Sequence, residues 1–173
     1  MRIAFYAPMK PPTHGTPSGD RRVAGMYMDA LARAGHRVEL VSTFRSYDGT
    51  GDAARQEALR GQGIALGRGL AAQWRSAAPG DRPDIWFTYH LYHKAPDWLG
   101  PEASAALGIP YVVAEASHAP KRAHGQWAIG HRGAEQAIRH ASLLLCPTRD
   151  DVAGLVPLVS DPARVVWMPP FLD

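Results

Sequence analysis

The sequence predicts an α/β domain, in which a doubly wound, mainly parallel sheet of the Rossmann-like kind carries helices on both faces. Apolar runs alternate with amphipathic stretches from one end of the chain to the other. Residues 2–7 form an almost continuous apolar run, which is typical of a strand buried on both faces of a parallel sheet. A strand, a loop, a helix and a second strand follow one another within about 40 residues, which is the order of a βαβ unit.

The signals that delimit the first helix are clear. Residues 8–17 are crowded with Pro, Gly and Thr and predict a loop. Ser18 is expected to cap the helix that follows, and Asp20 in its first turn suits the helix dipole. Gly35 supplies the left-handed residue at the end of that helix, and residues 37–42 form the next strand.

The middle of the chain is less regular. We predict a short helix at 53–60, a minor strand at 64–66 and a second amphipathic helix from Leu70 to the turn at Pro79. The remaining elements alternate as the fold class requires, with strands at 84–89, 111–115, 143–146 and 165–168 and helices at 101–107, 126–141 and after Thr148, which is expected to cap the last one.

The helix at 126–141 is expected to bury one apolar face and to keep its charges in water. Trp127, Ala134 and Ile138 make up the apolar face. The other positions carry basic side chains, so a surface position on an anionic membrane is the alternative; these side chains are His131, Arg132, Arg139 and His140.

Composition bounds the function. The chain has 173 residues, enough for one domain, and 46% hydrophobic with 20% charged residues excludes a disordered tail. A net charge of +3 suits an anionic small molecule or an acidic membrane face, but it is too small for a dedicated nucleic-acid binder. The lone Cys146, expected in the core, excludes an internal disulfide and favours a reducing compartment.

No apolar run approaches the length of a membrane span, and the N-terminus predicts a strand rather than a signal peptide. We therefore expect a cytoplasmic protein, with peripheral contact to the inner membrane face as an option.

In doubly wound sheets the ligand crevice lies outside the carboxyl ends of the strands. The first such loop contains Gly15 and Gly19, which allow close backbone approach, and the helix after it offers free N–H groups to a phosphate. The dinucleotide fingerprint G-x-G-x-x-G is absent. A flexible loop before an ordinary helix is the equal alternative.

The third strand is followed directly by aromatic and imidazole side chains. Tyr89 and His90 suit stacking and hydrogen bonding to a sugar, although packing beneath the next helix explains them equally well. His90 and His93 have a spacing that could bind a metal on a helix, but no acidic or cysteine partner stands at a convincing distance. We expect no metal site.

The segment after the fourth strand is the most informative. Cations there could hold a diphosphate or an anionic acceptor, and Glu115 or His118 could bind or polarise a hydroxyl group. No G-x-S-x-G motif is present, which disfavours a hydrolase triad, and a solvated basic loop is the alternative. The candidate residues in this segment are Glu115, Ser117, His118, Lys121 and Arg122.

Several landmarks occur in an order that resembles a known family. The opening strand, the loop ending in Ser18-Gly19-Asp20-Arg21 and the helix closing at Ala34-Gly35-His36 come first, and RPDIWFTYH, LGIPYVVAEAS, ASLLLCPT and VVWMPPFLD follow. Together they resemble the N-terminal domain of family-4-type retaining glycosyltransferases over essentially the whole chain. Three positions differ: Ser18 replaces the first of two glycines, Ser117 stands where a histidine that contacts the sugar is common, with His118 one position later, and Pro169-Pro170 replaces a Pro-Asn-Gly turn.

The resemblance implies one half of a GT-B architecture, in which two Rossmann-like domains face each other across a cleft. Residues 1–173 would be the acceptor-side half, and the C-terminal nucleotide-sugar-binding domain would lie outside this chain. The implied activity is hexosyl transfer from a nucleotide sugar to a glycan or lipid-linked acceptor, as in polysaccharide biosynthesis, with no metal and with this half inactive alone.

The resemblance also implies roles for individual residues. His118 would be catalytic, and the substrate-binding residues would be Gly19, Asp20, Arg21, Tyr89, His90, Glu115, Ser117, Lys121 and Arg122. Two other functions remain open, namely a stand-alone nucleotide- or small-molecule-binding module and one half of a nucleotide-sugar epimerase.

Overall fold

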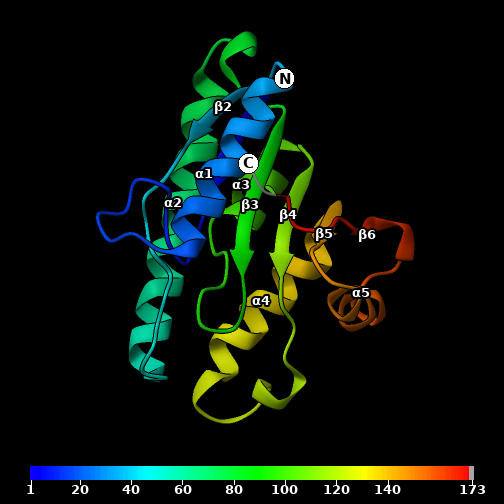
Figure 1. Cartoon of the computed structure of the whole chain (residues 1–173). Coiled ribbons are helices and arrows are strands. Elements are labelled where there is room, and N and C mark those ends of the chain that lie inside the picture. The colour runs from blue at the N-terminus through cyan, green and yellow to red at the C-terminus, as the bar shows by residue number, and fades with distance from the viewer. Residues whose placement is uncertain (172–173) are drawn as a thin grey trace.

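The sheet is parallel throughout the described chain. The computed structural model describes residues 1–171, so the last two residues of the VVWMPPFLD motif lie outside it. Six strands form one sheet in the order β2-β1-β3-β4-β5-β6, and each neighbouring pair is parallel (Figure 1). This confirms the predicted doubly wound α/β class. The strands are β1 (Arg2–Tyr6), β2 (Arg37–Leu40), β3 (Ile85–Leu91), β4 (Tyr111–Ala116), β5 (Leu143–Cys146) and β6 (Val165–Trp167).

Helices cover both faces of the sheet. On one face α1 packs through Ala24 and Tyr27 against Phe5 and Phe87. The opposite face, which includes Trp86, is covered by the four other helices. The inner strands β1, β3 and β4 are therefore buried on both sides, which explains their nearly continuous apolar sequences. The helices are α1 (Gly19–Arg33), α2 (Ala53–Ser76), α3 (Gly100–Leu107), α4 (Ala128–His140) and α5 (Arg149–Leu155).

Three predicted helix signals are confirmed by the structure. The Ser18 hydroxyl accepts a hydrogen bond from the backbone N–H of Arg21 at 3.2 Å. The Thr148 hydroxyl accepts a hydrogen bond from the backbone N–H of Asp151 at 3.0 Å. Gly35 has a φ of +83°, which a residue with a side chain rarely adopts. These caps satisfy backbone groups that the helix ends leave without partners.

The predicted break in the middle of the chain is wrong. Residues 53–76 form one continuous helix, α2, and the proposed minor strand at 64–66 lies inside it. A Cβ on Gly63 would meet the Trp98 Cβ at 2.5 Å, and a Cβ on Gly67 would meet the Leu99 carbonyl oxygen at 2.6 Å. These two glycines therefore form a contact face for close packing. The packing outweighs the low helix propensity of glycine.

The exposed position predicted for His131 is also wrong. Trp127, Ala134 and Ile138 are buried as expected, but His131 is only 4% exposed. A Cβ on Gly133 would overlap the indole of Trp98, so α4 lies very close to the loop after β3. His131 packs against the segment after β4, where its ring centroid lies 5.0 Å from that of His118.

No helix in residues 1–171 combines the length and the apolar character that a membrane span requires.

The close approach of α4 gives a testable prediction. Gly133→Ala is expected to lower the free energy of unfolding by about 1–3 kcal/mol, because the added methyl group must displace the Trp98 ring. Gly61→Ala is the control, since an added Cβ there meets nothing and the better helix propensity should raise stability by up to about 1 kcal/mol. Urea unfolding of both variants measures the difference. Equal changes would contradict the packing of α4 on Trp98.

Candidate functional site

Two adjacent strands carry an unusual backbone conformation at the same level of the sheet. The register pairs Tyr89 with Ala114 and Leu91 with Ala116, so His90 stands opposite Glu115. His90 has a φ of +59° and Glu115 a φ of +58°. Within residues 1–171 no other non-glycine residue has a positive φ. The left-handed region costs an L-residue about 1–2 kcal/mol, so this pair is held there by its surroundings.

The left-handed residues make both strands change sides. Residues two apart in a strand ordinarily share a face. Tyr89 packs on the α1 side of the sheet, whereas Leu91 belongs to the opposite core. Ala114 and Ala116 differ in the same way. Backbone strain of this kind is common at functional sites, and here it falls at the carboxyl ends of the strands, where ligands bind in this fold.

Four side chains meet at this point, and we call them the strand-end cluster: Asp20, Tyr89, His90 and Glu115. His90 Nδ1 lies 2.9 Å from the Asp20 carboxylate, which comes from the first turn of α1. The Tyr89 hydroxyl donates a hydrogen bond to Glu115 Oε2 at 3.3 Å. The side chains of His90 and Asp20 are 25% and 27% exposed, so both are reachable from solvent. Tyr89 is buried.

The electrostatics of the cluster favour a neutral hydroxyl beside a proton-holding carboxyl group. Burial raises the pKa of Glu115 above its ordinary value, and nearby His90 and the Tyr89 hydroxyl oppose part of that rise. Burial, followed by the charge of Glu115, raises the pKa of Tyr89. Tyr89 therefore remains a hydrogen-bond donor, and Glu115 holds its proton to a higher pH than an exposed glutamate does.

The remaining residues predicted near α1 are on the surface. Gly19 is the first residue of α1, is exposed, and has no atom within 4 Å of an added Cβ. Arg21 Nε donates to the Pro12 carbonyl oxygen at 3.1 Å, which fastens the loop to the helix. An open groove of about 480 Å³ lies along this loop and α1, and Ser18 and Arg21 are among the residues that line it.

The segment after β4 leaves the sheet in a defined way. The Ser117 backbone N–H donates to the Leu91 carbonyl oxygen at 3.0 Å, and its side chain is exposed. Lys121 and Arg122 lie in a 3₁₀ turn. Lys121 is exposed, whereas the Arg122 Nε atom is buried without a hydrogen-bond partner. Within residues 1–171 no hydrogen bond or ion pair joins these side chains to the strand-end cluster.

His118 contacts α4. Its Nε2 lies 3.5 Å from Glu135 Oε2, and its ring centroid lies 5.0 Å from that of His131. The sequence analysis did not identify Glu135, and it placed His131 in water. The spacing of four residues between them, which puts both on one face of a helix, is the signal that could have found the pair.

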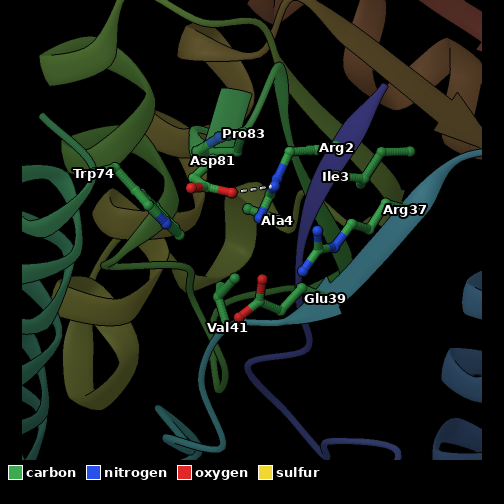
Figure 2. Close-up of a pocket in the computed structure, with 9 residues that line it drawn as sticks. All are labelled: Arg2, Ile3, Ala4, Arg37, Glu39, Val41, Trp74, Asp81 and Pro83. Carbon is green, nitrogen blue, oxygen red and sulfur yellow. Dashed lines mark hydrogen bonds and ion pairs between the residues drawn. The ribbon is translucent and has the colours of Figure 1, made fainter. Parts of the chain in front are cut away.

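A separate small pocket lies elsewhere on the sheet. Figure 2 shows it between β1, β2 and α2, with the Arg2 guanidinium turned toward the Asp81 carboxylate at 2.8 Å. Its volume of about 10 Å³ has room for a single water molecule, so it is too small for a sugar or a nucleotide.

Comparison with known proteins bears on this arrangement. A family model described as a glycosyl transferase 4-like domain matches residues 18–170. The chain belongs to this family. The match includes the loop end, α1 and every strand from β2 to β6, and so the whole strand-end cluster. No curated protein matches the sequence.

Two solved structures share the fold of this family member. UDP-GlcNAc 2-epimerase from Methanocaldococcus jannaschii matches with a TM-score of 0.59 and 10% identity over 96% of this chain and 45% of that protein. HepE from Anabaena, solved in complex with UDP and glucose, matches with a TM-score of 0.54 and 14% identity over 100% of this chain and 45% of that one. The chain thus spans less than half the length of either structure.

The left-handed conformation of Glu115 can be tested by stability alone. Glu115→Ala and Glu115→Gly both remove the carboxylate, but only glycine accepts a φ of +58° without steric cost. The glycine variant is expected to be more stable than the alanine variant by about 1 kcal/mol. Denaturant unfolding of the two proteins measures this, and an alanine variant of equal or greater stability would refute the assigned backbone.

The contacts of the cluster predict a pKa change. His90 lowers the pKa of Glu115, so His90→Gln is expected to raise it further. Carbon NMR of labelled glutamate carboxyl groups measures the pKa, with Glu115→Gln to assign the signal and His36→Gln as a control. Because the pKa is already raised by folding, this group stabilises the fold at low pH and loses that contribution as the pH rises through the raised value. A fall in the pKa of Glu115 in the His90→Gln variant would contradict the electrostatic effect of His90 on Glu115.

Proposed function

We propose that this chain is the N-terminal, acceptor-side half of a glycosyltransferase that moves a sugar from a nucleotide sugar to a glycan or lipid-linked acceptor. The family match and the UDP and glucose bound to HepE support this function. The observation that carries it is the strand-end cluster, because a carboxyl group, an imidazole and a tyrosine hydroxyl meet at the carboxyl ends of parallel strands.

The proposed chemistry follows from these groups. Transfer breaks the bond between the anomeric carbon and the diphosphate and forms a bond to the acceptor oxygen. The nucleoside diphosphate leaves and takes up the proton of the acceptor hydroxyl. Glu115 and the Asp20–His90 pair can bind sugar hydroxyls, while the N-terminus of α1 at Gly19 offers N–H groups to the diphosphate. We propose that no metal takes part in this step, since helix N-termini and cationic side chains can stabilise the departing diphosphate. Ser117, Lys121 and Arg122 remain proposed substrate contacts, and a catalytic role of His118 stays a prediction.

A second half is part of the proposal. The nucleotide-sugar-binding domain would lie outside these 173 residues, as the 45% coverage of both solved structures suggests. The chain alone is then expected to be inactive, and contact with the cytoplasmic face of a membrane would bring it to a lipid-linked acceptor.

A nucleotide-sugar epimerase is the second candidate, favoured by the likeness to the Methanocaldococcus enzyme. An epimerase changes its nucleotide sugar without an acceptor, whereas a transferase needs one. A stand-alone binding module would do neither.

The test uses the complete protein isolated from its own cells. An intact mass of about twice that of this chain would support a two-domain enzyme. A panel of nucleotide sugars is then incubated with and without acceptors. Product only with an acceptor supports transfer, product without one supports epimerisation, and a mass near 18.8 kDa with no turnover supports the binding module.

Gly19→Val tests the donor contact in the same protein. A Cβ added at Gly19 meets no atom of residues 1–171 within 4 Å, so folding should survive while the diphosphate is obstructed. Donor affinity is expected to fall by about tenfold or more, with Gly61→Val, an exposed helical glycine, as the control. Unchanged affinity in calorimetry would remove Gly19 from the site.

A further inference from the structure

Three potential metal ligands meet where the segment after β4 reaches α4. His118 belongs to that segment, and His131 and Glu135 stand four residues apart on α4. We propose that these three side chains bind a divalent transition-metal ion of the Zn²⁺ class. This inference is independent of the proposed function, because metal binding is measured without donor or acceptor.

The three side chains lie close together, at distances slightly longer than those between the ligands of a bound zinc ion. His118 Nε2 lies 3.5 Å and His131 Nδ1 lies 3.9 Å from the same oxygen, Glu135 Oε2. One ligand atom from each of the three residues lies within 4.8 Å of the other two. Ligand atoms in a tetrahedral zinc site lie roughly 3.3–3.5 Å apart, given bond lengths of 2.0–2.2 Å. A side-chain movement of about 1 Å would therefore complete the site.

The two imidazoles have unused hydrogen-bonding capacity. The side chains of His118 and His131 are 11% and 5% exposed. The Nε2 atom of each is buried without a hydrogen-bond partner. Buried polar atoms almost always have partners, so the Nε2 atom of His131 requires an explanation, whereas His118 Nε2 has the 3.5 Å contact with Glu135 Oε2. A cation bound through His131 Nε2 supplies one, because that nitrogen carries the lone pair of a neutral imidazole whose proton is on Nδ1.

The carboxylate is already oriented. Arg139 donates two hydrogen bonds to Glu135 Oε1, at 2.8 and 3.0 Å. The other oxygen, Oε2, is left facing the two imidazoles. Metal-binding carboxylates are commonly held in this way by a neighbouring hydrogen bond. Glu135 is therefore positioned before a metal arrives.

Two imidazoles and one carboxylate are a donor set typical of zinc, and they leave a fourth position for water. The expectation of no metal came from the spacing of His90 and His93 and from the family resemblance, and neither concerned this group of side chains. His90 pairs with Asp20, while His93 packs with its ring centroid 5.7 Å from Trp127. The proposed ion would instead join the segment after β4 to α4 and so fix the direction in which that segment leaves the sheet.

The experiment uses the chain without a polyhistidine tag, after treatment with a chelator. Zinc is titrated against a chromophoric competitor, and cobalt(II) is added separately to report tetrahedral coordination by visible absorption. We expect one tight equivalent of zinc. At about a hundredfold excess over the dissociation constant, zinc should raise the melting temperature by roughly 5–10 °C.

Variants identify the ligands. His118→Gln and Glu135→Gln are each expected to weaken zinc binding by at least about tenfold and to abolish the cobalt absorption. His36→Gln, which changes a histidine between α1 and β2, should match the wild type. Circular dichroism of each variant verifies folding. Absence of a tight equivalent, or zinc binding that survives both ligand variants, would overturn the proposal. Stabilisation by inorganic phosphate in place of zinc would also overturn it and would indicate an anion site.

Discussion

The pairing of β3 with β4 at His90 and Glu115 is the constraint on which the site depends. Both residues adopt left-handed backbone at matching positions of adjacent parallel strands. A single strand that changed sides alone would lose register with its neighbour, because side chains alternate with a period of two. Since both strands change together, the ladder continues from Tyr89–Ala114 to Leu91–Ala116 and both cores stay filled.

This paired change joins the sheet to α1. It places His90 within hydrogen-bonding distance of Asp20, in the first turn of the helix. Glu115 accepts a hydrogen bond from the hydroxyl group of buried Tyr89. The cap of α1 by Ser18 keeps that first turn in place. Packing of Tyr27 against Phe87 and Tyr89 holds the helix on this face of the sheet. The polar contacts therefore rest on an apolar framework, in which the positions of three elements are set before any ligand binds.

The sequence predicted the sheet well because parallel strands buried on both faces are almost continuously apolar, and the caps at Ser18 and Thr148 are local signals. It failed at α2, where Gly63 and Gly67 are selected by contact with Trp98 and Leu99 that no local pattern records. His131 is a second case, because local periodicity predicted that its side chain would be exposed to solvent.

Within the candidate site, the strand-exit rule found all four members of the strand-end cluster, but it could not tell which of them touch. The left-handed backbone of Glu115 had no signal, and that of His90 had only a weak one, since histidine adopts this region more often than most residues but still rarely. The grouping of His118 with Glu135 depends on the distance between a loop and a helix, which follows only from tertiary packing.

The strand order has a consequence for synthesis of the chain. β1 pairs on one side with β2, which follows it after one helix. Its other neighbour is β3, so Ile3 can pair with Ile85 only after the intervening chain has been synthesised. A ribosome adds about 5–20 residues per second, and β1 is therefore exposed along one edge for several seconds before β3 emerges. During that time an apolar strand with free backbone groups is open to pairing with another nascent chain. Central β1 is thus the segment for which binding by a chaperone during translation would matter most.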